Sequence, residues 1–220
     1  MEKHPEINGL RTWIEIDRAA IAHNYRLHRG ILAPTTKFMA VVKSNSYGHS
    51  LIDFSKEIES LGADWLGVDS IVEGIALRRE GIKLPILVLG YTLPSRLAEA
   101  ADNNISVAVS TFETLSELEN FDKKISIHIK VDTGMHRQGF MAGDRTRLIS
   151  TLKSLPKNIF VEGLFTHLAA EKDPAFPETA LAQLKEFEMW RNLFLSNDLK
   201  PMFHVAAAAG AMIFPQAHFD

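Results

Sequence analysis

Short apolar runs alternate with amphipathic helical stretches along almost the whole chain. Most of the runs are continuously apolar, which is typical of strands buried on both faces of a parallel sheet. Parallel strands that alternate with helices are joined by right-handed crossovers, so the pattern predicts an α/β fold with helices outside the sheet. The predicted strands are Phe38–Val42, Trp65–Val68, Ile86–Leu89, Val107–Val109, Ile125–Val131, Val161–Phe165 and Met202–Val205.

The stretches between these runs carry helix start and stop signals. Polar residues that accept a hydrogen bond from the first turn favour a helix start, and glycine favours a stop. Before the first run, residues 13–17 alternate in polarity and predict a short extra strand. The predicted starts are Asp17, Ser95 and Thr111, the predicted stops are Gly62 and Gly81, and a longer helix is expected from about Glu178 to Ser196.

The number of predicted strands limits the architecture. A closed barrel of eight parallel strands usually needs about 250 residues, and this chain has 220. We expect one domain over residues 1–220, a TIM-type (β/α)8 barrel truncated before its eighth strand, with residues 1–17 as a preceding strand segment. An open, doubly wound sheet is the alternative.

Composition narrows the class of protein. The formal net charge of −3 does not suggest nucleic acid or an anionic membrane as a partner. The absence of cysteine excludes disulfides and thiolate chemistry. No apolar run approaches the ~18 residues needed to span a bilayer, and the start of the chain does not resemble a signal peptide. We expect a cytoplasmic protein with no metal site and a small-molecule partner.

Lys43 stands where the first predicted strand, Phe38–Val42, ends. In a βα barrel the carboxyl ends of the strands carry the reactive side chains. A lysine partly removed from water there can serve as an amine nucleophile toward an aldehyde. By position alone, a lysine that simply leaves the core is the better interpretation.

The predicted strand Ile125–Val131 differs from the others because polar and apolar residues alternate along it. Ser126, His128 and Lys130 share one face. Successive side chains of a strand point to opposite faces, so these polar residues point the same way. A polar inward face in a barrel usually indicates a site.

Three stretches resemble the signatures of the alanine racemase family. Ala40–His49, with the sequence AVVKSNSYGH, resembles the family's cofactor-lysine motif. Asp132–Phe140, DTGMHRQGF, is similar to the second signature, and Gly163–Ala169, GLFTHLA, to the third. The stretches occur in the family's order, and the resemblance covers almost the whole chain.

The resemblance implies a barrel that binds pyridoxal 5'-phosphate at its mouth. Lys43 would carry the cofactor and act as one of two racemising bases. Tyr47 would donate its hydroxyl to the phosphate. Arg137 would lie near the cofactor's phenolic oxygen and the substrate carboxylate, and His167 under the pyridine ring. Lys130 corresponds to a position that is often carbamylated in the family, where the new carboxylate holds Arg137.

The chain also departs from the family pattern. His204 corresponds to the family's seventh-strand histidine and is counted among the cofactor-binding residues. The family follows it with Asn-Ser, whose hydroxyl binds phosphate, but Ala207 and Ala208 stand there in this chain. One phosphate ligand is therefore expected to be lost.

Three further parts of the family site are not found between Met1 and Asp220. They are the second base, a tyrosine from the C-terminal β domain of the partner subunit of a homodimer, the ring-nitrogen arginine of the eighth strand, and the C-terminal phosphate ligands. We expect a pyridoxal-phosphate-dependent racemase acting on L- and D-alanine, which would supply D-alanine for peptidoglycan, present here as its barrel domain with impaired activity. The alternatives are a non-catalytic carrier of the cofactor and a racemase of broader specificity for serine or other amino acids. A plain structural module ranks last.

Overall fold

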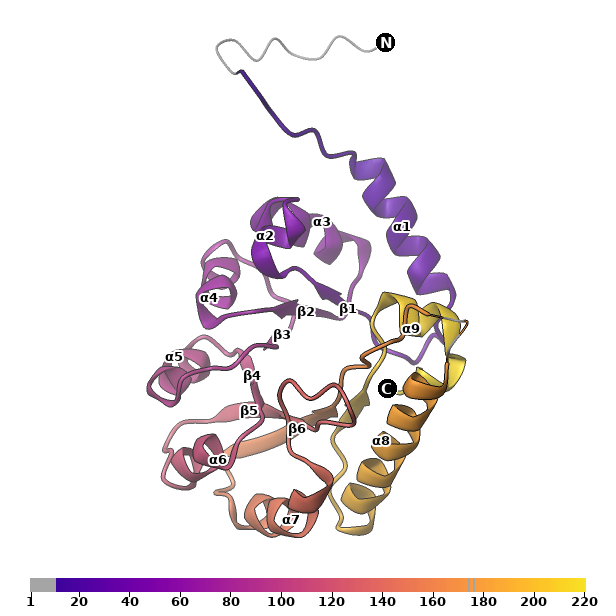
Figure 1. The fold of residues 1–220 in the computed structure, drawn as a ribbon. Helices are drawn as coiled ribbons and strands as arrows, with labels where there is room; N and C mark the ends of the chain where they lie inside the picture. Colours follow the sequence, from indigo (N-terminus) through magenta and orange to yellow (C-terminus); the bar gives the residue numbers. More distant parts are fainter. Residues whose placement is uncertain (1–10, 174, 176) are drawn as a thin grey trace.

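A computed structural model describes residues 11–173, 175 and 177–220 of the chain. Seven parallel strands form one sheet in the order β1-β2-β3-β4-β5-β6-β7. The sheet curls around a central axis, and most of the helices lie on its outer side (Figure 1). The strands are β1 (Met39–Val41), β2 (Trp65–Val68), β3 (Ile86–Val88), β4 (Ser106–Val109), β5 (Ile125–Lys130), β6 (Ile159–Phe165) and β7 (Met202–His204).

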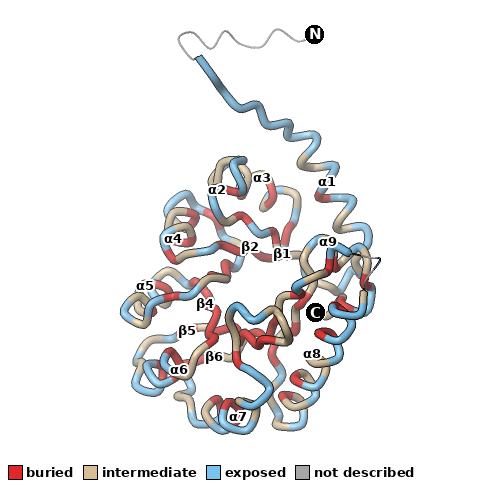
Figure 2. Tube along the Cα trace, viewed as in Figure 1, coloured by how far each residue is buried: buried red, intermediate tan, exposed pale blue. Residues whose placement is uncertain are grey.

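The helices between the strands show the expected amphipathic packing. The residues of β2, β3 and β4 are all buried, while the outer surfaces of the helices are largely exposed (Figure 2). The elements are α1 (Arg18–Gly30), α2 (Lys43–Tyr47), α3 (Leu51–Leu61), α4 (Ile71–Arg79), η1 (Pro94–Arg96), α5 (Leu97–Asp102), α6 (Phe112–Glu119), η2 (Ala142–Asp144), α7 (Arg145–Ser154), α8 (Glu178–Ser196), α9 (Ala208–Ile213) and η3 (Pro215–Ala217).

This is the predicted barrel, open where an eighth strand would lie. Within the described residues, β1 and β7 are the two edges of the sheet and do not pair with each other. Phe219 and Asp220 lie beside this opening. The backbone N–H of Asp220 donates to the Phe203 carbonyl at 3.1 Å, and Thr36, which precedes β1, donates its hydroxyl to the Phe219 carbonyl at 3.2 Å.

Most of the predicted helix signals are confirmed. The Asp17 carboxylate accepts from the N–H groups of Ala19 and Ala20, and Thr111 accepts from Thr114. Gly62 follows α3 with φ +93°. A side chain would be strained in that left-handed conformation, which explains glycine at this helix end.

Two local predictions are wrong. Residues 13–17 form no strand, because nothing in the described structure pairs with them; Trp13 is 51% exposed and Ile14 78%. Ser95 does not cap a helix but lies inside the 3-10 turn of η1, and Arg96 precedes α5 without a side-chain cap. The proline before Ser95 suits the first position of such a turn, so the chain begins to wind at Pro94, two residues before the Arg96 start that a Ser95 cap predicts.

No helix in the described part of the chain is both long and apolar enough to cross a membrane.

Candidate active site

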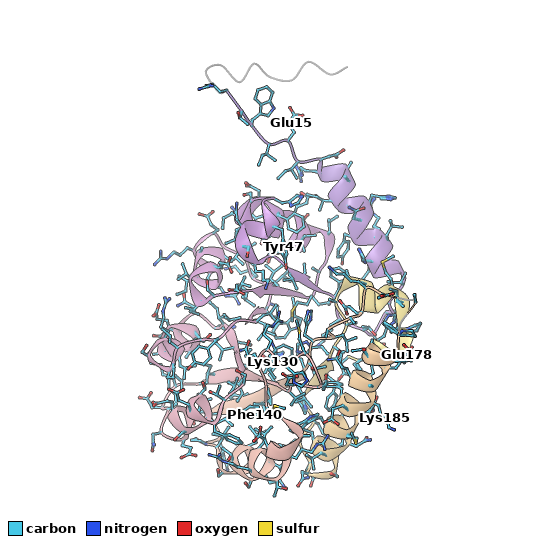
Figure 3. The ribbon with its side chains drawn as sticks, in the orientation of Figure 1. Glu15, Tyr47, Lys130, Phe140, Glu178 and Lys185 are labelled. Atoms are coloured by element: carbon cyan, nitrogen blue, oxygen red, sulfur yellow. The ribbon has the colours of Figure 1, made fainter. Side chains whose placement is uncertain are left out.

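A cavity of about 890 Å³ opens at the carboxyl ends of the strands and extends along the open side of the barrel. All of the side chains predicted for the site line it. Figure 3 shows Lys130 inside the ring of strands and Tyr47 on α2, at the edge of the same region. The predicted residues that meet in this cavity are Lys43, Tyr47, Lys130, Arg137, His167 and His204.

Lys43 begins a turn with an unusual backbone. The four residues that follow it, Ser44 to Tyr47, have φ between 51° and 55°. A left-handed turn of residues other than glycine costs roughly 1–2 kcal/mol per residue, and strain of this kind concentrates at functional sites. The turn directs the Lys43 amine to within 3.5 Å of the Asp69 carboxylate, with the lysine side chain 35% exposed.

Specific hydrogen bonds hold this strained turn. The Ser44 N–H donates to Glu73 at 2.7 Å, and the same carboxylate accepts from the Asp69 N–H at 2.8 Å. The Asn45 side chain accepts from the N–H of Leu51 at 2.8 Å and so ties the turn to α3. The Glu73 side chain therefore fixes two backbone positions. One is Ser44, which follows Lys43, and the other is Asp69, whose carboxylate lies near the Lys43 amine.

Lys130 is almost completely enclosed at the end of β5, with 5% of its surface exposed. Burial, and to a smaller extent the nearby Arg137 guanidinium, lowers the pKa of Lys130 to about 8. Its amine lies 3.4 Å from the Gln138 side-chain oxygen. Roughly a tenth of Lys130 is thus uncharged at pH 7, where an ordinary lysine is almost entirely protonated.

The loop after β5 carries Arg137, and the Asp132 carboxylate holds the backbone of this loop in place. Asp132 accepts backbone hydrogen bonds from Gly134, Met135, His136 and Arg137 at 2.8–3.2 Å. Burial acts to raise the pKa of Asp132, but these N–H groups outweigh it, and the pKa lies below the usual value. The sequence motif from Asp132 onward therefore encodes a rigid loop as well as the arginine.

The two cavity histidines are held neutral. Burial lowers the pKa of His167, and the cations of Arg137, Lys130 and Lys43 lower it further. Burial also lowers the pKa of His204 well below its usual value, with a smaller contribution from His128. Near pH 7 both rings act as hydrogen-bonding groups rather than as cations.

These shifts predict that mild acid destabilises the fold through its two cavity histidines. The unfolded chain binds protons on these histidines below about pH 6.5 and the folded chain does not, so stability is full above that pH and falls below it. At pH 5.5 the loss from His204 alone is expected to be on the order of 1 kcal/mol. Urea denaturation at pH 7.5 and 5.5 measures it, and no difference between the two would contradict the prediction. His167→Gln should reduce the difference.

A buried carboxylate, Glu171, lies beside Ala207, one of the two positions at which a phosphate ligand is expected to be lost. Glu171 is 5% exposed, and its Oε2 atom accepts from the Ala207 N–H at 3.3 Å. Burial raises the pKa of Glu171. The methyl groups of Ala207 and Ala208 offer no hydroxyl, so the structure contains no replacement for it at these two positions.

Sequence reasoning missed Asp69, Glu73, Gln138 and Glu171. Only Glu73 had a readable signal, because Ser70 and Glu73 form a capping box at the start of α4. Gln138 lies next to Arg137 within the second signature, but nothing in that pattern indicated its contact with Lys130. Asp69 and Glu171 belong to the site only through contacts between distant segments.

Comparison with known proteins decides the family. The family model of the alanine racemase N-terminal domain matches residues 16–220. The chain belongs to the alanine racemase family. It is 38% identical to the alanine racemase of Symbiobacterium thermophilum over 98% of this chain and 58% of that protein. The alanine racemase of Syntrophobacter fumaroxidans is 36% identical over 95% of this chain and 56% of its own length.

Solved structures of the alanine racemase family have the same fold. The Clostridium difficile 630 alanine racemase in complex with cycloserine matches with a TM-score of 0.90 and 29% identity, over 96% of this chain and 59% of that chain. The Corynebacterium glutamicum alanine racemase matches with a TM-score of 0.86 and 33% identity, over 93% of this chain and 59% of that chain. The chain thus spans a little over half the length of the relatives it matches.

Proposed function

We propose that this chain is the cofactor-binding barrel of a pyridoxal-phosphate-dependent racemase that interconverts L- and D-alanine. The observation that carries the proposal is the convergence of the Lys43 amine, the Arg137 guanidinium and the Lys130 amine on one cavity. The proposal includes a cytoplasmic location, a homodimeric complete enzyme and a role in D-alanine supply for peptidoglycan, as the family resemblance implies.

The donor set of the cavity fits pyridoxal 5'-phosphate. The cofactor carries an aldehyde, which needs an amine, and anionic oxygens, which need hydrogen-bond donors or cations. Lys43 offers the amine on a lysine that is 35% exposed, Tyr47 offers a hydroxyl, and Arg137 offers a guanidinium that suits anionic oxygens. When bound, the cofactor supplies an electron sink for a negative charge at the substrate Cα.

The side chains of this chain then have distinct tasks. The Lys43 Nζ holds or releases the Cα proton, and the Asp69 carboxylate 3.5 Å away balances its charge when it is protonated. Arg137 binds the amino-acid carboxylate, which fixes the orientation of Cα toward Lys43. His167, held neutral, accepts or donates a hydrogen bond without adding a further positive charge to the cavity.

The first test is chemical capture of the cofactor. Pyridoxal phosphate added to the chain, followed by borohydride reduction and peptide mapping, is expected to place the label on Lys43. Lys43→Ala should abolish that label, whereas Lys172→Ala, a matched change of another lysine that lines the cavity, should retain it. Labelling at Lys130, or scattered labelling of surface lysines, would contradict the proposal.

A second expectation concerns Lys130, which we propose is carbamylated. The uncharged form of its amine attacks carbon dioxide, forms a carbon–nitrogen bond and releases a proton, and the resulting anion replaces a cation beside Arg137. This turns a repulsion into an attraction in a partly dry site. Carbon-13 NMR in labelled bicarbonate should show a carbamate signal that is lost in Lys130→Ala. A signal that persists in that variant would place the carbamate elsewhere.

A further inference from the structure

A chain of polar side chains crosses the barrel interior beside the cavity, and two of its members, His128 and His204, line the cavity. The Nδ1 atom of His128 lies 2.9 Å from Nε2 of His204. The Nε2 atom of His128 lies 3.4 Å from the Glu162 carboxylate, and the Ser106 hydroxyl donates to the same carboxylate at 2.6 Å. The side chains come from β4, β5, β6 and β7, so the fold itself assembles the chain.

The packing around the two rings fixes their positions. The edge of Trp65 lies against His128 with ring centroids 5.4 Å apart, and Phe165 stacks on His204 at 4.7 Å. Gly163 pairs with His128 across the strands, at a register shift in β6. A Cβ atom on Gly163 would lie 2.0 Å from His128 Nδ1, so glycine is required for the ring to occupy this place.

The positions of the protons follow from these contacts. A neutral imidazole has one donor nitrogen and one acceptor nitrogen. The His128 side chain is 1% exposed, and its Nε2 atom faces the Glu162 carboxylate at 3.4 Å. Burial acts to raise the pKa of Glu162, but the nearby His128 ring and the hydrogen bond from Ser106 outweigh it, so the pKa is lowered and the carboxylate is charged.

A lone pair on His128 Nε2 would face this anion and be repelled, so Nε2 carries the proton. Its Nδ1 atom is then an acceptor, and His204 must donate to it from Nε2. Because His204 is neutral, its Nδ1 atom keeps a lone pair. That atom has no hydrogen-bond partner in the described part of the chain, and His204 lines the cavity.

We propose that Glu162 and His128 are positioning residues that hold His204 in its Nε2-protonated tautomer, so that the barrel presents the Nδ1 lone pair to the cavity. The floor of the cavity then favours an N–H or O–H donor, or a cation, and disfavours an anion. The tautomer rests on these contacts and on the charge states of Glu162 and His204. Its use in orienting a bound group rests on the proposed function.

A doubly protonated His128 is the competing arrangement, and it would reverse the polarity of His204. The contact between His128 and Glu162 is 3.4 Å long, and His128 Nε2 makes no well-aligned hydrogen bond in the described structure. A charge-assisted bond is typically about 2.7–2.9 Å long. An enclosed imidazolium without such a bond is costly, which favours the neutral ring.

The test is histidine nitrogen-15 NMR on the cofactor-free 220-residue chain at pH 7.5, with signals assigned by His128→Asn and His204→Asn. Both rings are expected to show a protonated Nε2 and an unprotonated Nδ1. In Glu162→Gln the amide can donate to His128 as well as accept, so the tautomer ratio of His204 should fall on the order of fivefold. Ser106→Ala keeps the carboxylate and should leave both rings unchanged.

A protonated Nδ1 on His204 in the unaltered chain, or identical His204 signals in Glu162→Gln, would overturn the proposal. If Glu162→Gln does not fold, the spectrum of the unaltered chain decides alone. No cofactor is present, so failure of Lys43 to capture pyridoxal phosphate leaves this result standing, and a wrong tautomer leaves the capture experiment standing.

Discussion

The 220-residue chain is expected to racemise alanine about 10²–10⁴-fold more slowly than a form extended to the full length of its relatives. The expected difference equals the usual effect of one positioned general base. Racemisation needs a proton removed from one face of Cα and returned to the other, so two groups must flank the substrate. The Lys43 amine can provide one of them.

The three tyrosines of this chain are poorly placed to provide the other, and Tyr91 does not line the cavity. Tyr25 packs against Phe38 with ring centroids 5.1 Å apart, and burial raises its pKa. Tyr47 lies in the turn that follows Lys43 and is proposed to bind the phosphate. The family resemblance instead implies a tyrosine from a C-terminal domain of the partner subunit.

The measurement is the interconversion of alanine enantiomers by both forms, each loaded with pyridoxal phosphate. Lys43→Arg in the extended form is the matched control, because it removes the amine while keeping a positive charge. Equal turnover numbers for the short and extended forms would show that a residue within the 220 serves as the second base.

The strands were predictable because each one is defined by its own residues. A buried parallel strand needs an unbroken apolar run, and β2 and β3 have one that water cannot reach. Residues 13–17 show the limit of this reasoning. Their alternating pattern resembles a strand, but a strand also requires a neighbour, and sequence periodicity does not supply one.

The site residues that lie at strand ends could be predicted from the sequence. The parts of the site that depend on an unusual local backbone or on contacts between distant residues could not. Lys43, Lys130 and His204 meet because parallel strands bring their carboxyl ends together. The four left-handed residues after Lys43, from Ser44 to Tyr47, include no glycine. The sequence therefore contains no sign of this turn. It persists because Glu73, 29 positions away from Ser44, binds the Ser44 N–H.

Gly163→Ala is expected to destabilise the barrel by about 3 kcal/mol, at the upper end of the usual cost of overpacking a core. The new methyl group would lie 2.0–2.6 Å from three atoms of the His128 ring. That ring is enclosed and hydrogen-bonded to His204, so it has no free space into which to move. Gly143→Ala is the matched control, because nothing lies within 4 Å of the place its new methyl group would take, and surface changes of this kind usually stay within about 0.5 kcal/mol.

A double-mutant cycle tests whether the His128 ring is the cause. His128→Ala removes the atoms that the methyl group would strike, so Gly163→Ala in that background should cost less than about 1 kcal/mol, and the two changes should couple by about 2 kcal/mol. Urea unfolding with unchanged slopes gives the four free energies. An undiminished cost in the His128→Ala background would mean that backbone conformation at the β6 register shift, and not the histidine ring, requires glycine.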